Sequence, residues 1–147
     1  MKAEILSVGT ELLLGQIVDT NAAYIARRLA ELGITLYRKT TVGDNLARVS
    51  AAVREALERA DIVIATGGLG PTEDDLTREA AADALSIRLI ESPEVLADLA
   101  RFFGARGAYM TGNNRRQALM PEPGAGRLIP NPLGTAPGVL FEAGDKR

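Results

Sequence analysis

The sequence predicts a three-layer α/β fold, with helices on both faces of a mostly parallel sheet and an antiparallel edge near the C-terminus. Strand and helix patterns alternate three or four times over the first 105 residues, and short connections of this kind favour right-handed crossovers between parallel strands. Segment 62–66 is apolar throughout, as a strand covered on both faces should be. Five of the seven prolines fall between residues 121 and 138, where two strand-like fragments flank a loop.

The first strand is expected at residues 3–8. A helix follows over about 19–32, with polar cap residues at its start and a glycine just beyond its end. The second strand is expected at 34–42. Arg38 interrupts its apolar face, which predicts a position near the edge of the sheet.

A second helix is expected to begin at a cap formed by either Asp44 or Asn45, because apolar residues then recur at helical spacing. The apolar strand 62–66 comes next and runs into a glycine-rich loop. An alanine-rich helix with an acidic start is expected over about 74–85.

The last third is predicted to be less regular. The expected elements are a short strand at 87–90, a helix from Ser92 to about Phe103, a polar helix at 113–119 and strand fragments at 127–129 and 139–142. The final fragment is followed by a turn-like composition with no returning strand. We therefore expect one domain over 1–147 that stops just before an antiparallel partner.

The chain contains no histidine, no cysteine and no tryptophan. These absences exclude a Ser-His-Asp triad, a disulfide framework and a histidine- or cysteine-ligated zinc, and we expect no haem or flavin. The net charge of −2 gives no electrostatic footprint for nucleic acid. Apolar runs are too short to cross a membrane, and residues 1–5 do not resemble a signal peptide. The cytoplasm is the expected location.

The strongest functional motif runs from the end of the 62–66 strand into the next helix. Gly67, Gly68 and Gly70 let the chain turn tightly and let a phosphate approach the main-chain amides, and Thr72 follows them. Acidic residues stand where that phosphate would lie, which favours a divalent cation such as Mg²⁺ between them, with Asp75 as a ligand. The alternative is an ordinary glycine turn whose acids complement a helix dipole.

A second carboxylate follows the second strand. Asp44 lies at the carboxyl end of this strand, the side on which open α/β sheets bind ligands, so it can share a cation with Asp75. The alternative is that Asp44 only caps a helix. Thr10 and Glu11 follow the first strand at the same edge and are candidate ligand contacts.

Polar residues of the last third are weaker candidates. Asn114 and Arg116 could bring an amide and a guanidinium to a diphosphate, although a solvated helix face explains them equally well. Asn131 and Thr135 offer polar contacts from a loop rich in proline and glycine.

Five segments, in order, resemble the molybdopterin-binding-like domain of the CinA family of competence/damage-inducible proteins. They are residues 8–15 with Asp19-Thr20-Asn21, Val42-Gly43-Asp44, residues 67–77, residues 114–118, and residues 131–138. This fold is shared with the MogA and MoaB proteins of molybdenum-cofactor synthesis, whose glycine loop usually reads Gly-Gly-Thr-Gly with a basic residue before the key aspartate. Leu69 and Glu73-Asp74 here are similar to the CinA branch instead.

The resemblance implies metal-dependent hydrolysis of ADP-ribose to AMP and ribose 5-phosphate. It assigns Asp44 and Asp75 to the acidic, metal-binding centre and Gly67, Gly68 and Gly70 to the phosphate loop. A MogA-like role and a non-catalytic pterin- or nucleotide-binding module are the alternatives. It also implies a dimer or trimer. A C-terminal amidase-like domain and a late ligand loop of the family have no counterpart in these residues, so we expect a truncated domain with impaired activity.

Overall fold

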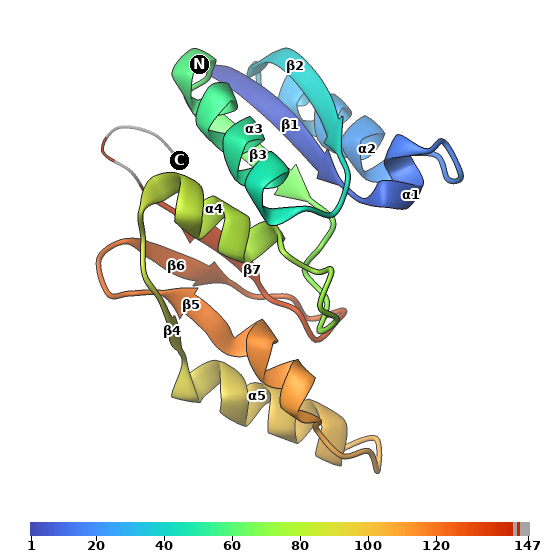
Figure 1. Ribbon diagram of the computed structural model, residues 1–147, viewed down its shortest axis with the longest axis vertical. Helices are drawn as coiled ribbons and strands as arrows, with labels where there is room; N and C mark the ends of the chain where they lie inside the picture. The colour runs from blue at the N-terminus through green and yellow to red at the C-terminus, as the bar shows by residue number, and fades with distance from the viewer. Residues whose placement is uncertain (143, 145–147) are drawn as a thin grey trace.

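A three-stranded parallel sheet forms the first half of the computed structural model, which describes residues 1–142 and 144 (Figure 1). Its strand order is β2-β1-β3, with β1 at Lys2–Val8, β2 at Thr35–Val42 and β3 at Ile62–Thr66. Because β1 is central, Ala3 to Val8 are all buried, whereas most of β2 is exposed. The edge position expected for the second strand from Arg38 is confirmed.

Helices cover both faces of this sheet, as predicted (Figure 1). On one face, α2 (Thr20–Glu31) packs against Ala3 and Ile5 of β1. On the other face, α3 (Leu46–Arg59) and α4 (Thr77–Leu85) pack against Leu6 and Val8. The alternation of side chains along β1 therefore builds two separate cores.

The caps of these helices decide an alternative that the sequence left open. Asn45, not Asp44, caps α3, because its side chain accepts a hydrogen bond from the Arg48 amide. Asp19 caps α2 through the Ala22 amide. The side chain of Asp44 is therefore not used to cap α3. A short helix, α1 (Thr10–Leu13), links β1 to the loop before α2.

The second half is built around α5 and two short antiparallel ladders. Met120 and Ala118 pack with Val95 and Leu99 of α5 to form a third core. The elements are β4 (Leu89–Glu91), α5 (Pro93–Gly104), the 3-10 helix η1 (Gly112–Ala118), β5 (Leu119–Pro121), β6 (Gly126–Ile129) and β7 (Gly138–Phe141). β4 pairs with β5, and β6 pairs with β7. The predicted fold class, a mostly parallel sheet with antiparallel strands toward the C-terminus, is confirmed.

Three details differ from the sequence prediction. The strand expected at 87–90 lies at Leu89–Glu91 and pairs with β5 in an antiparallel arrangement. Each of these two strands has three residues, which is too few to show an alternating pattern. The helix expected from residue 74 begins at Thr77, because the preceding acidic residues form a loop. The last strand was expected to lack a partner, but β7 pairs with β6, which precedes it.

One buried carboxylate lies in the central strand. Glu4 is 2% exposed, and both its oxygens accept hydrogen bonds from Arg59 of α3, at 2.9 and 3.1 Å. Removing one partner of such a pair leaves a desolvated charge without compensation.

We therefore expect Arg59→Met to lower the midpoint of urea unfolding by roughly twice as much as Arg54→Met does. Arg54 is the matched control, because it pairs with Asp83 and both side chains of that pair are about half exposed. Circular dichroism during urea titration measures both midpoints, and equal shifts would contradict the expectation.

Candidate functional site

A cleft of about 350 Å³ lies at the carboxyl ends of the parallel strands. It is lined by the last residues of β1 and β3, by the loop after each strand and by the start of α2. Among the described residues, its lining includes no lysine or arginine but five carboxylates: Glu11, Asp19, Asp44, Asp74 and Asp75. We call it the acidic cleft. Five carboxylates repel an anionic ligand, so such a cleft disfavours an anion that enters without a cation.

Asp44 is held in the cleft by α1. Its Oδ2 accepts a hydrogen bond from the Thr10 amide at 2.7 Å, and its own amide donates to the Thr10 hydroxyl at 3.1 Å. This reciprocal pair fixes the loop after β2 against the loop after β1. Thr10 itself is not among the residues that line the cleft, whereas Glu11 is.

Asp75 belongs to the loop of residues 72–75, which we call the acidic loop. Its Oδ2 accepts hydrogen bonds from the amide of Thr72 at 2.9 Å and from the hydroxyl of Thr72. Burial raises the pKa of Asp75, but the bonds from Thr72 and the Gly70 amide and the charge of Arg116 outweigh that effect and hold the pKa below its usual value. Asp75 is therefore a carboxylate throughout the neutral range.

The glycine turn lies between β3 and the acidic loop. Gly67 has a φ of +92°, and a Cβ there would lie 2.0 Å from the carbonyl oxygen of Val8. At Gly70, a Cβ would lie 2.4 Å from Oδ2 of Asp75. The glycines thus let the turn approach β1 and the site carboxylate more closely than any side chain allows. Gly67, Gly68 and Thr72 line the cleft, whereas Gly70 does not, and the phosphate contacts expected of these residues stay predictions.

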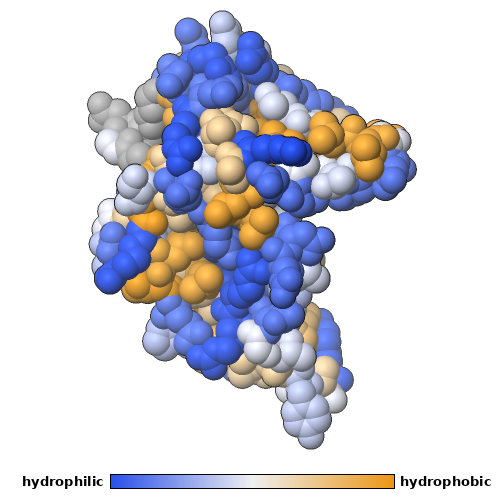
Figure 2. Space-filling model, viewed as in Figure 1, coloured by the Kyte–Doolittle hydropathy of each residue, from blue (hydrophilic) through white to orange (hydrophobic). Residues whose placement is uncertain are grey.

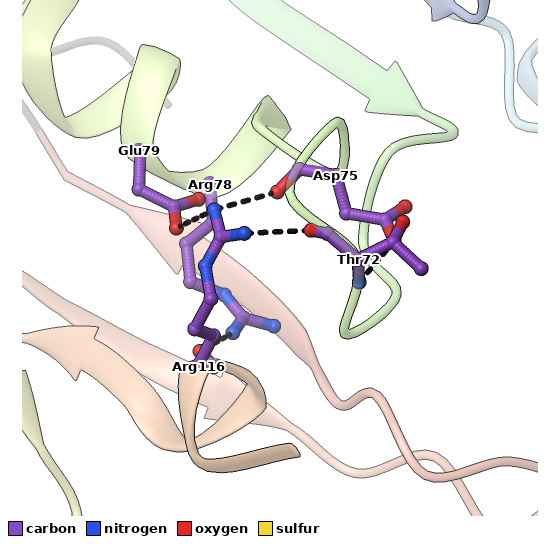
Figure 3. Close-up of polar contacts among 5 residues, drawn as sticks. All are labelled: Thr72, Asp75, Arg78, Glu79 and Arg116. Carbon is purple, nitrogen blue, oxygen red and sulfur yellow. Dashed lines mark hydrogen bonds and ion pairs between the residues drawn. The ribbon is translucent and has the colours of Figure 1, made fainter. Parts of the chain in front are cut away.

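Arg116 does not line the acidic cleft. Its guanidinium donates to the carbonyl oxygens of Thr72 and Asp75 at 2.6 and 3.2 Å and to Glu79 at 2.8 Å (Figure 3). It therefore lies behind the acidic loop, on the side of α4. The phosphate contact expected for it stays a prediction, and these protein contacts occupy both terminal nitrogens.

The other candidates of the last third lie apart from the cleft. Asn114 accepts hydrogen bonds from the amide and hydroxyl of Thr111, the residue that caps the start of η1. Asn131 and Thr135 line a second groove, of about 420 Å³, between α5 and the loop after β6. The structure thus brings Glu11, Asp44, Gly67, Gly68, Thr72 and Asp75 together in one cleft, with Thr10 and Gly70 outside its lining, and separates them from Asn114, Asn131 and Thr135.

Sequence reasoning missed two features of the cleft. Its local sequence favours a helix cap for Asp19, and Asp19 does cap α2, but it also lines the cleft and accepts a hydrogen bond from Ser7 at 2.5 Å. The second feature is an apolar rim: Ile17 and Val18 line the cleft and are 53% and 83% exposed. Figure 2 shows apolar side chains gathered where α1 and the following loop project from the molecule. The sequence signal for this rim is that Ile17 and Val18 directly precede the Asp19 cap.

A divalent cation fits this donor set only together with a ligand. Within the described residues, no group of three or more carboxylates is arranged to hold a metal ion by itself. Mg²⁺ at phosphate sites is commonly held by one or two carboxylates, with phosphate and water oxygens as the remaining ligands. Asp44 and Asp75 are two carboxylates that line one cleft, and a cation shared between them stays a prediction.

Comparison with known proteins identifies the family. Residues 4–146 match the family model described as "Probable molybdopterin binding domain". The chain belongs to this family. A "CinA-like protein" of Rippkaea orientalis is 54% identical over 142 residues, which are 97% of this chain and 34% of that protein. The chain therefore spans about a third of the length of the curated relatives it matches.

Solved structures place the domain in the CinA branch. The protein CinA of Thermoplasma acidophilum, described as having unknown function, superposes with a TM-score of 0.90 at 37% identity, covering 99% of this chain and 83% of that one. The molybdopterin biosynthesis enzyme MoaB of Thermus thermophilus gives a TM-score of 0.55 at 27% identity, covering 74% and 67%. The predicted resemblance to CinA, MoaB and MogA is confirmed. No helix in residues 1–142 has the length and apolar character to span a membrane.

Proposed function

We propose that the acidic cleft binds a phosphorylated pterin or a nucleotide, with a divalent cation between its phosphate and the carboxylates of Asp44 and Asp75. The observation that carries this proposal is the composition of the cleft: five carboxylates, no basic residue among the described lining, and a glycine turn forming part of its wall. Membership of the molybdopterin-binding family supports the ligand class.

The apolar rim favours a ligand that carries a flat heterocyclic ring. Ile17 and Val18 are exposed and stand at the opening of a cleft whose lining is otherwise rich in acids. A flat heterocycle buries their apolar surface while the phosphate end reaches the carboxylates. A plain inorganic anion gains nothing from this rim.

Calorimetric titration with ADP-ribose tests the proposal. We expect binding in the presence of Mg²⁺ and a loss of affinity of about tenfold or more when EDTA replaces it, because the carboxylates then repel the diphosphate. Adenosine is the matched ligand without phosphate. Equal affinity for adenosine and ADP-ribose, or no effect of EDTA, would contradict the proposal; a pterin phosphate and NAD in the same series rank the ligand classes.

A second candidate function is hydrolysis of the bound diphosphate, the main prediction from the sequence. The observation that favours it is that Asp44 and Asp75 line one cleft with three further carboxylates, Glu11, Asp19 and Asp74. A bound cation would neutralise the diphosphate. Water would attack one phosphorus, the anhydride bond would break to release AMP and ribose 5-phosphate, and a cleft carboxylate would accept the proton, since the chain has no histidine.

The remaining expectations stay predictions. The dimer or trimer, the cytoplasmic location and the single domain limited to residues 1–147 follow from composition or resemblance alone. The MogA-like role in molybdenum-cofactor synthesis is disfavoured by Leu69 and by the acids Glu73 and Asp74.

A further inference from the structure

Arg116 holds the acidic loop in place on the side that faces α4. It donates to main-chain carbonyls at both ends of this loop, Thr72 and Asp75, and to the carboxylate of Glu79 on α4 (Figure 3). The planar guanidinium presents several donors in a rigid fork, which suits three acceptors at fixed positions. The loop that carries Asp75 is thereby tied to α4 on the side away from the cleft.

Arg78 connects Arg116 to a more distant segment. Its side chain is 5% exposed and donates to the carbonyl oxygen of Arg116 at 3.0 Å and to that of Pro137 at 3.1 Å. Its Nε has no partner among the described residues. Burial lowers the pKa of Arg78, as does the charge of Arg116, whereas the nearby carboxylate of Glu79 opposes them. The two carbonyl contacts and Glu79 together offset the cost of burying this cation.

Pro137 belongs to the loop of residues 131–138, which we call the proline-rich loop. The loop is internally fixed, because the Asn131 side chain donates to the Ala136 carbonyl at 2.9 Å and accepts from the Leu133 amide at 3.1 Å. Thr135 accepts a hydrogen bond from buried Gln117 at 3.1 Å. None of these residues lines the acidic cleft. The hydrogen bonds that join the loop to the site run from the Pro137 carbonyl through Arg78 and Arg116 to the acidic loop.

We propose that Arg116 is a positioning residue for Asp75, and that Arg78 couples it to the proline-rich loop, so that this loop sets the affinity of the cleft without touching the ligand. The inference rests on the proposed function for its ligand, but the positioning itself concerns the free protein. Outer contacts that orient a metal-binding carboxylate commonly change affinity by about 10- to 100-fold.

Titration of ADP-ribose with Mg²⁺ into Arg116→Met, Arg116→Lys and Arg115→Met tests the first step. We expect about tenfold weaker binding in Arg116→Met and nearly as much in Arg116→Lys, because lysine keeps the charge but not the fork of donors. Arg115 is the matched control: it pairs with Glu91 instead, and we expect its variant to bind as the natural chain does. Full rescue by lysine would show that Arg116 acts by charge, and would overturn positioning.

A ligand-free measurement separates this inference from the proposed function. In ¹H–¹⁵N spectra, the amides of Gly70 and Thr72, which donate to Asp75, are expected to shift in both Arg116 variants and not in Arg115→Met. Unchanged resonances would overturn the positioning even if the natural chain binds ADP-ribose. If the natural chain does not bind, the proposed function fails while the spectra still decide the positioning.

The second step is tested at Asn131, because replacement of buried Arg78 can prevent folding. Asn131→Ala loosens the proline-rich loop away from the cleft, and we expect binding about threefold weaker or more, together with shifts of the same two amides. Unchanged affinity and unchanged amides in a folded Asn131→Ala variant would overturn the coupling.

Discussion

Replacing Gly67 with alanine is expected to lower the free energy of unfolding by about 3–5 kcal/mol, as urea titration followed by circular dichroism would measure. Two costs add at this position. The φ of +92° is strained for any residue with a Cβ, and that Cβ would lie 2.0 Å from the Val8 carbonyl oxygen. The clashing atom is main chain of the central strand, so it cannot move aside as a side chain would.

Gly15→Ala is the matched control, because it separates the two costs. Gly15 has a similar φ of +71°, but nothing lies within 4 Å of the added Cβ. We expect this variant to lose only about 1 kcal/mol, from backbone strain alone. If Gly67→Ala lowers the free energy of unfolding no more than Gly15→Ala does, the contact between the added Cβ and β1 carries no cost of its own, and the expectation is wrong.

Local patterns predicted the first half of the fold well because local physics determines it. Caps at Asp19 and Asn45, a glycine after α2 and apolar residues at helical spacing are all visible in the sequence. The second half depends on pairing between short segments distant in the chain. β5 has three residues and ends in Pro121, so nothing local signals that it pairs with β4.

The candidate site shows the same difference between residues that local patterns predict and residues that depend on tertiary contacts. Asp44, Asp75 and the glycine turn follow parallel strands, whose carboxyl ends share one edge, so topology alone places them together. Arg116 and Asn131 lie in the irregular segments, where only tertiary contacts show what each side chain binds. Arg78 could not be singled out, because an arginine on an amphipathic helix is normally exposed.

The largest functional effect is expected at Asp75. Asparagine can keep the acceptor oxygen for Thr72, whose amide and hydroxyl both bond to Oδ2, while it removes the charge that a cation requires. We therefore expect Asp75→Asn to fold normally and to bind ADP-ribose with Mg²⁺ about 10- to 100-fold more weakly. Any hydrolysis to AMP, followed chromatographically, is expected to fall by at least that factor.

Asp74→Asn removes the same charge from the next residue of the same cleft. No hydrogen bond within the described chain fixes the Asp74 side chain in the way that Thr72 and Gly70 fix Asp75. If the negative potential of the cleft alone attracts the cation, both variants lose affinity equally. If Asp75 is a direct ligand, its variant loses much more, because an oriented carboxylate contributes through its position as well as its charge. Undiminished binding or hydrolysis in Asp75→Asn would show that Asp75 is not a ligand of the cation, and positioning of Asp75 by Arg116 would then have no effect on binding.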